Sequence, residues 1–517
     1  MKNLAFFLTI FCRIKLIFHY LTSALTNNIF LMTLVYGSFI LSIISLFIRY
    51  DMRFIDSDIM YLPTLYNDLT KWGGNFLEWR LTPAPYYFPD MLIFFSINYI
   101  FNNFLISLTI MQIIQIFFYV FGWFFLYNIL NKDKLENPLP LPCLSLFAFS
   151  STMIFFYKDF SLIIKPFSYI SYHFGIALST PYFIAIISVF LFHEFSKINR
   201  IFLYGLIFIF TFILTASDLL FVVQVSLPCI LTLFFLTWID PKVNRKYIFV
   251  LTGWIVLGSV CGFLVKFTKD IVLSYTVFKG GSGYKPELIV RSIDNMRIWI
   301  EHSIENNPVA IGIVALSLVV ELVIVLLGVY RLLSRKSFPM PVFTICLFIM
   351  LSVALNCSAI ILVGMFPDPR TSRYIYTLII ISPFFLPFFT VFLERNFLFK
   401  IVLSITGVFI SISSIIQFDN FKSLKRYSVF YPPVMECLDR NLHTRGLKNG
   451  IGNYWDAKYF TMLSRYNLKI TQVRDKDILL YHWISNFEWY KRFPPNFIIL
   501  NTKMSDPHLF IEEDVIK

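Results

Sequence analysis

Long apolar stretches separated by short basic segments make up most of this 517-residue chain, and they constrain its fold more than any other feature. A helix rises about 1.5 Å per residue, so roughly 20 apolar residues cross the hydrocarbon core of a bilayer. The chain is 57% hydrophobic and only 15% charged, whereas soluble domains carry about a quarter charged residues. The sequence therefore predicts an all-α polytopic membrane protein. About eleven spans are expected, near residues 29–48, 104–130, 139–156, 176–193, 201–216, 218–238, 247–265, 308–330, 340–364, 374–393 and 397–417.

Basic residues indicate how these spans are oriented. Short loops between spans carry clusters of lysine and arginine, as in "SKINR" from residue 196 and "DPKVNRK" from residue 240. This pattern is typical of cytoplasmic loops, so the net charge of +13 reports membrane topology. The basic residues form no single face or tail, and a nucleic-acid partner is not expected. With the N-terminus cytoplasmic and an odd number of spans, the outside face receives residues 49–103, 157–175, 266–307, 365–373 and everything after 417.

Three regions are expected along the chain. Residues 1–28 resemble an N-terminal interfacial segment, because Arg13 and Lys15 interrupt a short apolar stretch and no cleavage site of small residues is visible. Residues 29–417 form the multi-span membrane domain, with a long first outside loop at 49–103. Residues 418–517 have a soluble composition, in which "VMECLDRNL" and "DAKYFTMLSRY" show helical spacing, while "GIGNYW", "LKITQV" and "NFIIL" indicate short strands. We expect a small extracytoplasmic α/β domain there.

The first outside loop has predicted structure of its own. Apolar positions from Leu62 to Leu69 recur at helical spacing, with Asp68 among the polar residues between them, as in a helix that lies in the membrane interface. Three prolines in "WRLTPAPYYFPD" forbid a regular helix in the next segment. Residues 90–101 are too short to span comfortably, and a second helix resting in or re-entering the interface is expected there.

Asp56 and Asp58 are the leading candidates for catalysis, because they follow the first span directly and would face the outer membrane surface. A carboxylate there can act as general base toward a hydroxyl or amine, and a second can orient it or hold a divalent cation. The alternative is a solvated loop in which an aspartate caps the following helix, since Asp is a favoured N-cap residue.

Asp218 is a further acidic candidate, in "TASDLLF" within an otherwise nearly uncharged stretch. At the bilayer centre a carboxylate would cost about 2.5–3.5 kcal/mol. The stretch is also long enough for a tight hairpin, which would place Asp218 at the outside apex. In both placements it can face the same cavity as Asp58, and a structural cap at the hairpin turn is the alternative.

Basic residues on the predicted outer face are candidates for binding a phosphate, because the positive-inside pattern works against them there. These candidates are Arg370, Arg373, Arg291, Arg297, Lys158 and Lys165, together with His302. Arg373 heads a span and can instead extend its guanidinium to lipid headgroups. His173 and His302 lack the sequence spacing of a metal-binding pair.

The arrangement resembles the integral-membrane glycosyltransferases of the C superfamily, of the protein mannosyltransferase and aminoarabinose transferase type. The resemblance lies in "DSD" in the first outside loop, in the proline-led aromatic segment "PYYFPDMLIFF", and in the late span that opens "SRYIYTLIIISPFF". It implies a sugar donor on a polyprenyl phosphate, a lipid, glycan or protein acceptor, and a location in a bacterial plasma membrane. It further implies that Asp58 is the base, that Asp56 supports it, and that Arg373 and Arg370 receive the phosphate. Tyr374, Asp218, Arg297 and His302 are the other expected substrate-binding residues.

Two other classes of membrane protein remain open. A secondary transporter or lipid flippase usually binds its substrate near the midplane, on broken helices between related halves. Here only Glu321 and Asp218 are candidates for midspan charge, and no halves match. A non-catalytic membrane assembly protein whose tail binds a partner is the third class. One feature separates the three classes: only a transferase requires that Asp56, Asp58 and Arg373 converge on one outer cavity.

Overall fold

The structure is a computed structural model that describes residues 57–130, 173–192, 196–240, 243–272, 286–306, 308–334, 336, 338–366, 374–375, 381, 430–474 and 479–500. The predicted interfacial segment at 1–28 and the predicted spans at 29–48, 139–156 and 397–417 lie outside these residues, as does nearly all of the span at 374–393. The domain boundaries expected after residues 28 and 417 lie outside them too.

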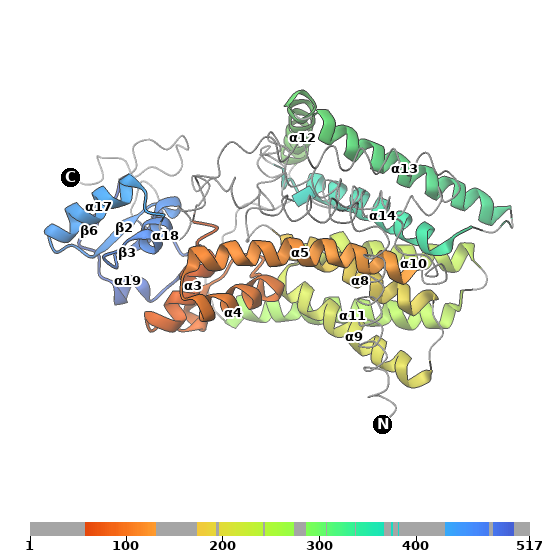
Figure 1. Ribbon diagram of the computed structural model, residues 1–517, viewed down its shortest axis with the longest axis horizontal. Helices are drawn as coiled ribbons and strands as arrows, with labels where there is room; N and C mark the ends of the chain where they lie inside the picture. Colours follow the sequence, from red (N-terminus) through yellow and green to blue (C-terminus); the bar gives the residue numbers. More distant parts are fainter. Residues whose placement is uncertain are drawn as a thin grey trace, which may run out of the picture.

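Seven of the described helices are long and apolar enough to cross a membrane. They form a bundle along the long axis of the molecule (Figure 1). Each coincides with one of the predicted spans, so these seven predictions are confirmed as helices. The bundle consists of α5 (Phe104–Leu130), α8 (Phe174–Phe192), α9 (Lys197–Ser217), α10 (Leu227–Ile239) with the π-helix η5 (Val222–Ser226) before it, α11 (Arg245–Val272), α13 (Pro308–Leu333) and α14 (Met340–Leu362).

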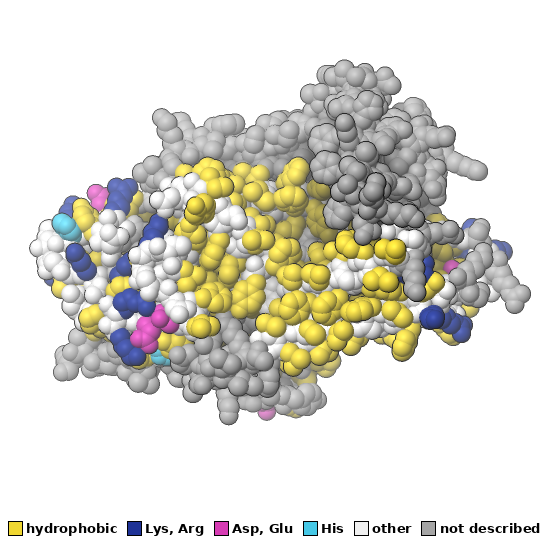
Figure 2. Space-filling view, turned by 90° about the horizontal axis from the view of Figure 1, so that it is seen from below, with side chains coloured by type: hydrophobic (Ala, Val, Ile, Leu, Met, Phe, Trp, Pro, Cys, Tyr) yellow, Lys and Arg dark blue, Asp and Glu magenta, His cyan; other side chains and the backbone are white. Residues whose placement is uncertain are grey.

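The distribution of side chains along this bundle is that of a membrane-spanning protein. Hydrophobic side chains cover the middle of the molecule, and charged side chains gather at its two ends (Figure 2). The C-terminal domain lies at one end, and α13 turns back into α14 at the other (Figure 1). From α8 to α14 the successive spans alternate in direction, so the predicted cytoplasmic segments around residues 196 and 240 fall at the end away from the C-terminal domain (Figure 1).

Two glycines let α9 and α11 approach each other closely. A Cβ on Gly258 of α11 would lie 2.9 Å from the backbone oxygen of Phe208 in α9, and a Cβ on Gly262 would lie 2.7 Å from that of Phe212. Apolar attraction between helices is weak in lipid, so membrane helices associate through small residues that let backbones approach. The Gly258 and Gly262 pair, four residues apart, serves this purpose for α9 and α11.

The first outside loop consists of short elements that pack against the end of the bundle. They are α3 (Tyr61–Lys71), the 3₁₀ turn η2 (Phe76–Glu78), β1 (Trp79–Arg80), the π-helix η3 (Tyr87–Met91) and α4 (Leu92–Phe101). The two helices predicted in this loop are therefore confirmed. Ser217, the last residue of α9, joins η3 to the bundle, because its hydroxyl donates to the Phe88 carbonyl at 2.8 Å and accepts from the Phe88 N–H at 2.9 Å.

The C-terminal domain is a small α/β unit, and the helices and strands predicted there are present. Its four-stranded sheet has the order β4-β3-β2-β6, with β2 parallel to β3 and β6, and β3 antiparallel to β4. A two-stranded sheet joins β5 of this domain to β1 of the first loop. The elements are α17 (Pro433–Thr444), β2 (Asn449–Gly452), α18 (Tyr454–Leu463), β3 (Lys469–Arg474), β4 (Leu479–Leu480), β5 (Ser485–Asn486), α19 (Trp489–Arg492) and β6 (Phe497–Ile498).

Asp68 of α3 anchors this domain to the first loop. Its carboxylate is fully buried and accepts hydrogen bonds from four side chains: Trp79 Nε1 at 2.6 Å, Asn486 Nδ2 at 2.7 Å, Trp489 Nε1 at 2.8 Å and Arg492 Nη1 at 3.3 Å. A buried carboxylate is stable only when it is paired and hydrogen-bonded in this way. The helical spacing places Asp68 among solvated residues, and the structure corrects that expectation: the polar side of α3 is the side that meets the C-terminal domain.

Candidate functional site

Asp58 lies in the turn before α3, where the first loop meets the C-terminal domain. Its Oδ1 accepts a hydrogen bond from the hydroxyl of Tyr454 in α18. The hydroxyl of the neighbouring Ser57 donates to the backbone carbonyl of Trp455 at 2.9 Å. Met60 is the N-cap of α3, and no side chain caps that helix. The helix-cap alternative for Asp58 is therefore wrong.

The segment that meets Asp58 follows the carboxyl end of β2. β2 lies between β3, which the chain reaches through α18, and β6. In open α/β sheets, ligands bind at the carboxyl ends of the strands, where connections leave a strand toward opposite sides of the sheet. Asn453 fixes the turn there, because its Oδ1 accepts from the Asp456 N–H at 3.0 Å. The predicted strand "GIGNYW" is consequently shorter than expected: it ends at Gly452, and α18 begins at Tyr454.

A second group of polar side chains lies at the adjoining ends of α8 and α9. His173 Nδ1 contacts Asp218 Oδ2, and the two side chains are only 10% and 7% exposed. Asp218 directly follows α9, and its Oδ1 accepts from the Leu220 N–H at 3.0 Å. Asp218 therefore lies at a hairpin turn, which was one of its two predicted placements. It both stabilises the turn and contacts the histidine.

Asp90 belongs to this second group. It lies in η3, outside the seven candidate spans, is fully buried, and accepts from Gln115 Nε2 at 2.7 Å. The pKa of the Asp90 carboxyl is raised to about 7, chiefly because burial disfavours its charged form. The hydrogen bond from Gln115 opposes this shift, and the negative charge of nearby Asp218 adds to it. Gly175 lets η3 approach α8, since a Cβ there would lie 2.5 Å from Asp90 Oδ2. The site thus holds an acidic group that exchanges its proton near neutral pH.

Tyr374 is brought to the same place from much later in the chain. Its ring centroid lies 5.3 Å from that of His173. Two amides in the bundle hold its backbone: Asn356 Nδ2 donates to the Tyr374 carbonyl at 2.8 Å, and Gln224 Nε2 donates at 3.1 Å. Gln224 lies in η5, where the π-helical turn breaks the regular hydrogen-bond pattern, as π-turns at functional sites often do. Asp218 and Tyr374 therefore meet through His173.

The remaining predicted binding residues are not seen at either of these two groups. Arg297 and His302 lie on exposed positions of α12 (Pro286–Asn306), and Arg297 Nε is 3.9 Å from Glu301 Oε1 of the same helix. Asp56, Arg370 and Arg373 lie outside the described residues. Within the described part of the chain, no group of three or more His, Cys, Asp or Glu side chains is arranged to hold a metal ion. The predicted divalent cation stays a prediction.

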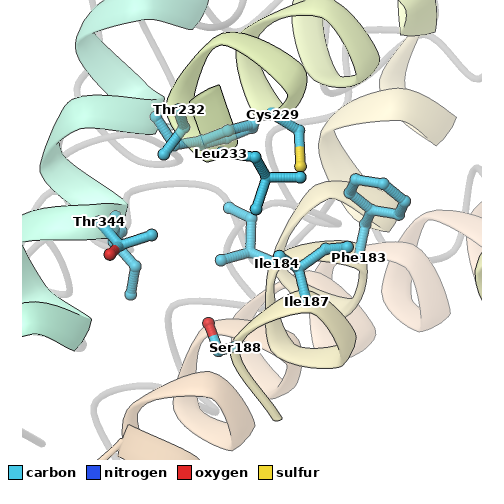
Figure 3. A pocket seen from close by; sticks show the side chains of 10 residues that line it. Phe183, Ile184, Ile187, Ser188, Cys229, Thr232, Leu233 and Thr344 are labelled. Atoms are coloured by element: carbon cyan, nitrogen blue, oxygen red, sulfur yellow. The ribbon is translucent and has the colours of Figure 1, made fainter. Parts of the chain in front are cut away.

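An apolar pocket lies inside the bundle between α8, α10 and α14 (Figure 3). Its ten lining residues include three hydroxyl side chains, Ser188, Thr232 and Thr344, but no carboxylate, imidazole or basic group. Thr232 and Thr344 donate to backbone carbonyls of their own helices at 2.8 Å. This pocket therefore lacks the acid–base groups that gather at the adjoining ends of α8 and α9, and it is not the candidate site.

The sequence did not predict the roles of several residues at the site. Tyr454 was placed in a strand, and its contact with Asp58 spans 396 positions. Asp90 was included in an interfacial helix without a role, although a single carboxylate in an apolar, proline-led segment is a usable signal. His173 was weighed only as a metal ligand. Its partner Asp218 lies 45 positions away, beyond any motif spacing.

Chemically, the described residues place two acid–base groups where the first loop covers the bundle. One is Asp58 with the Tyr454 hydroxyl, and the other is His173 with Asp218 and Asp90. Buried carboxylates with shifted pKa values and histidines oriented by a carboxylate are typical of sites that move protons. The chain matches no family model and no curated protein.

Proposed function

We propose that the chain is a membrane glycosyltransferase that moves a sugar from a polyprenyl-phosphate donor to an acceptor at the outer face of a plasma membrane. The observation that carries this proposal is the contact between Asp58, at the end of the apolar bundle, and Tyr454 of the C-terminal domain. A carboxylate held between a lipid-embedded bundle and a soluble domain can meet a lipid-linked donor and a soluble acceptor together. In this proposal the chain has about eleven spans, a cytoplasmic N-terminus and an extracytoplasmic C-terminal domain.

Asp58 is the proposed general base. It takes the proton of the acceptor hydroxyl, whose oxygen forms the new bond to the anomeric carbon while the bond from that carbon to the phosphate oxygen breaks. The products are the glycosylated acceptor and the polyprenyl phosphate, and Asp58 returns its proton to solvent. Because the phosphate leaves readily, positioning and proton transfer supply most of the required acceleration. The Tyr454 hydroxyl orients the carboxylate, and Asp56 supports it.

The departing phosphate needs positive charge, which we assign to Arg373 and Arg370. Arg373 directly precedes Tyr374, whose backbone is held by Asn356 and Gln224. Arg297 and His302 are exposed on α12, and we assign them to the polar part of the donor. An arginine can bind a phosphate through two parallel hydrogen bonds, which adds orientation to charge neutralisation.

The test is sugar transfer by the purified protein in nanodiscs supplied with radiolabelled polyprenyl-phosphate sugars and a membrane extract as acceptor. We expect Asp58→Asn to lower the rate by at least about 100-fold, the typical contribution of a general base. The matched control is Asp240→Asn, which changes a partly exposed aspartate at the opposite end of the bundle and should leave the rate unchanged.

Two results would count against the proposal in different ways. Full activity of a well-folded Asp58→Asn protein would remove Asp58 from the role of base. Absence of transfer by the wild-type protein from every polyprenyl-phosphate sugar would remove the glycosyltransferase assignment itself.

A further inference from the structure

Two aromatic side chains pack edge-on against the tyrosine that contacts Asp58, and a third follows close by in the chain. The ring of Tyr454 has its centroid 5.0 Å from that of Trp455 and 6.1 Å from that of Tyr481. Trp483 follows in the same turn, and its N–H donates to the Tyr481 carbonyl at 2.9 Å. Trp455, Tyr481 and Trp483 are each partly exposed, whereas Tyr454 is buried. We call these three side chains the aromatic platform.

A buried glutamine holds the platform in place. Gln472 of β3 donates through Nε2 to the backbone carbonyls of both Tyr481, at 2.7 Å, and Trp483. Its Oε1 accepts from Lys458 Nζ at 3.1 Å, so the amide is used at both ends. The main chain at 481–483 is thereby fixed although it belongs to no strand. A rigid aromatic surface loses little conformational entropy when a ligand binds to it.

Polar groups border the platform on the side of the first loop. The guanidinium of Arg80 lies 5.9 Å from the centroid of the Trp483 ring. Arg80 is paired with Ser485 across the β1–β5 sheet, so both side chains stand on the same face. The Ser485 hydroxyl is buried and has no hydrogen-bond partner among the described residues. A buried hydroxyl without a partner costs free energy, which a ligand or water that reaches it would offset.

We propose that the aromatic platform binds a sugar ring of the acceptor, which makes the acceptor a carbohydrate. One face of a sugar ring presents C–H groups that pack on an indole or phenol ring, while its hydroxyls require donors and acceptors at the edge. Trp455, Tyr481 and Trp483 supply the first requirement, and Arg80 with its several N–H donors supplies the second. The platform adjoins the residue that orients Asp58, so a bound ring would carry a hydroxyl toward the proposed base. The inference rests on the proposed function.

The test measures binding without any donor, so that it is independent of transfer. The full-length protein is placed in nanodiscs free of sugar detergents, labelled with a fluorophore and applied to a printed array of mono- to hexasaccharides. We expect the wild-type protein to bind at least one class of glycan. Trp455→Ala and Trp483→Ala should weaken that binding by about tenfold or more, and Trp483→Phe, which retains an aromatic face, by less.

The matched control is Trp238→Ala, because Trp238 is 75% exposed in the last turn of α10 at the opposite end of the bundle. It should bind glycans as the wild-type protein does, and melting temperatures confirm that all variants are folded. Absence of glycan binding by the wild-type protein, or equal binding by the alanine variants, would overturn the inference. If the protein transfers sugar but binds no glycan, the aromatic platform is not a sugar-binding site, and the proposed glycosyltransferase activity stands.

Discussion

His173 Nδ1 and Asp218 Oδ2 are in contact where α8 begins and α9 ends, although 45 positions and two transmembrane helices separate the residues. The carboxylate fixes which imidazole nitrogen carries the proton and leaves Nε2 as the nitrogen that can exchange one. His173 is also held from both sides, with its ring 5.7 Å from that of Tyr86 and 5.3 Å from that of Tyr374. The imidazole therefore has one defined orientation.

This contact predicts non-additive mutations. His173→Gln and Asp218→Asn each leave a buried polar partner poorly paired, and each should lower the free energy of unfolding by about 1–3 kcal/mol. The double variant should lose less than the sum, because the second change removes a group that the first had already left unpaired. Thermal or denaturant unfolding in nanodiscs measures all three proteins. Strictly additive losses would show that the two side chains do not act together.

The Asp90 carboxyl predicts a pH-dependent stability. Its pKa in the folded protein is about 7, above the ordinary value of 3.8. The folded state therefore binds more protons than the unfolded state between about pH 4 and pH 7, and the contribution of Asp90 to stability falls as the pH rises through this window. Asp90→Asn removes this titration. Melting temperatures of the two proteins should differ most above pH 7, in favour of the variant, and converge near pH 4. A constant difference at every pH would contradict the assignment.

Gly175 predicts a destabilising substitution in a helix where alanine is normally favourable. A Cβ at this position would lie 2.5 Å from Asp90 Oδ2 and 2.8 Å from Pro89 Cδ, and the proline ring cannot move aside. Gly175→Ala should therefore cost about 1–3 kcal/mol through overpacking. Gly205→Ala in α9 is the control, because nothing lies within 4 Å of its Cβ position. The control should be neutral or gain up to about 1 kcal/mol. Equal melting temperatures for the two variants would show that η3 does not pack on α8 in this way.

Cys437 provides a test of the proposed orientation. It is exposed in α17, whereas the other cysteines that the structure describes, Cys229, Cys261, Cys346 and Cys357, are buried or partly buried in the bundle. A membrane-impermeant maleimide should label Cys437 in intact cells if the C-terminal domain is extracytoplasmic. Cys437→Ser should abolish this signal. If Cys437 is labelled only after the membrane is opened, the C-terminal domain is cytoplasmic, and the proposed orientation of every span must be reversed.

The sequence predicted the helical bundle well, because the hydrocarbon thickness dictates the length of each apolar run. The span expected at residues 104–130 is α5 itself, Phe104–Leu130. The hairpin around Asp218 was one of the two placements that the sequence left open, since a charge divides an apolar stretch that is long enough to turn. The short helices and strands of the C-terminal domain were also visible in local periodicity.

The site was harder to predict, because its contacts are made between distant segments. Helical spacing assigned Asp68 to a solvated face, and only the folded chain shows the donors that bury it. Asp58 was chosen for its position after a span, but its partner Tyr454 could not be inferred from a pattern of neighbours. Periodicity reports which face of an element is apolar, and it carries no information about which other element covers the polar face.

The pairing of β1 with β5 has a consequence for how the protein is made. Asn486 of β5 donates to Asp68 across 418 positions, and Trp79 of β1 lies opposite Asn486 in the two-stranded sheet. While the ribosome is still producing the intervening helices, the first loop has neither its second strand nor three of the donors to Asp68. In a chain that stops before residue 479, the Asp68 carboxylate would lack three of its donors, and the edge of β1 that pairs with β5 would have no partner strand. Completion of the loop is therefore a late event in biogenesis, because it waits for residues 486–492, which are made after all the described helices of the bundle.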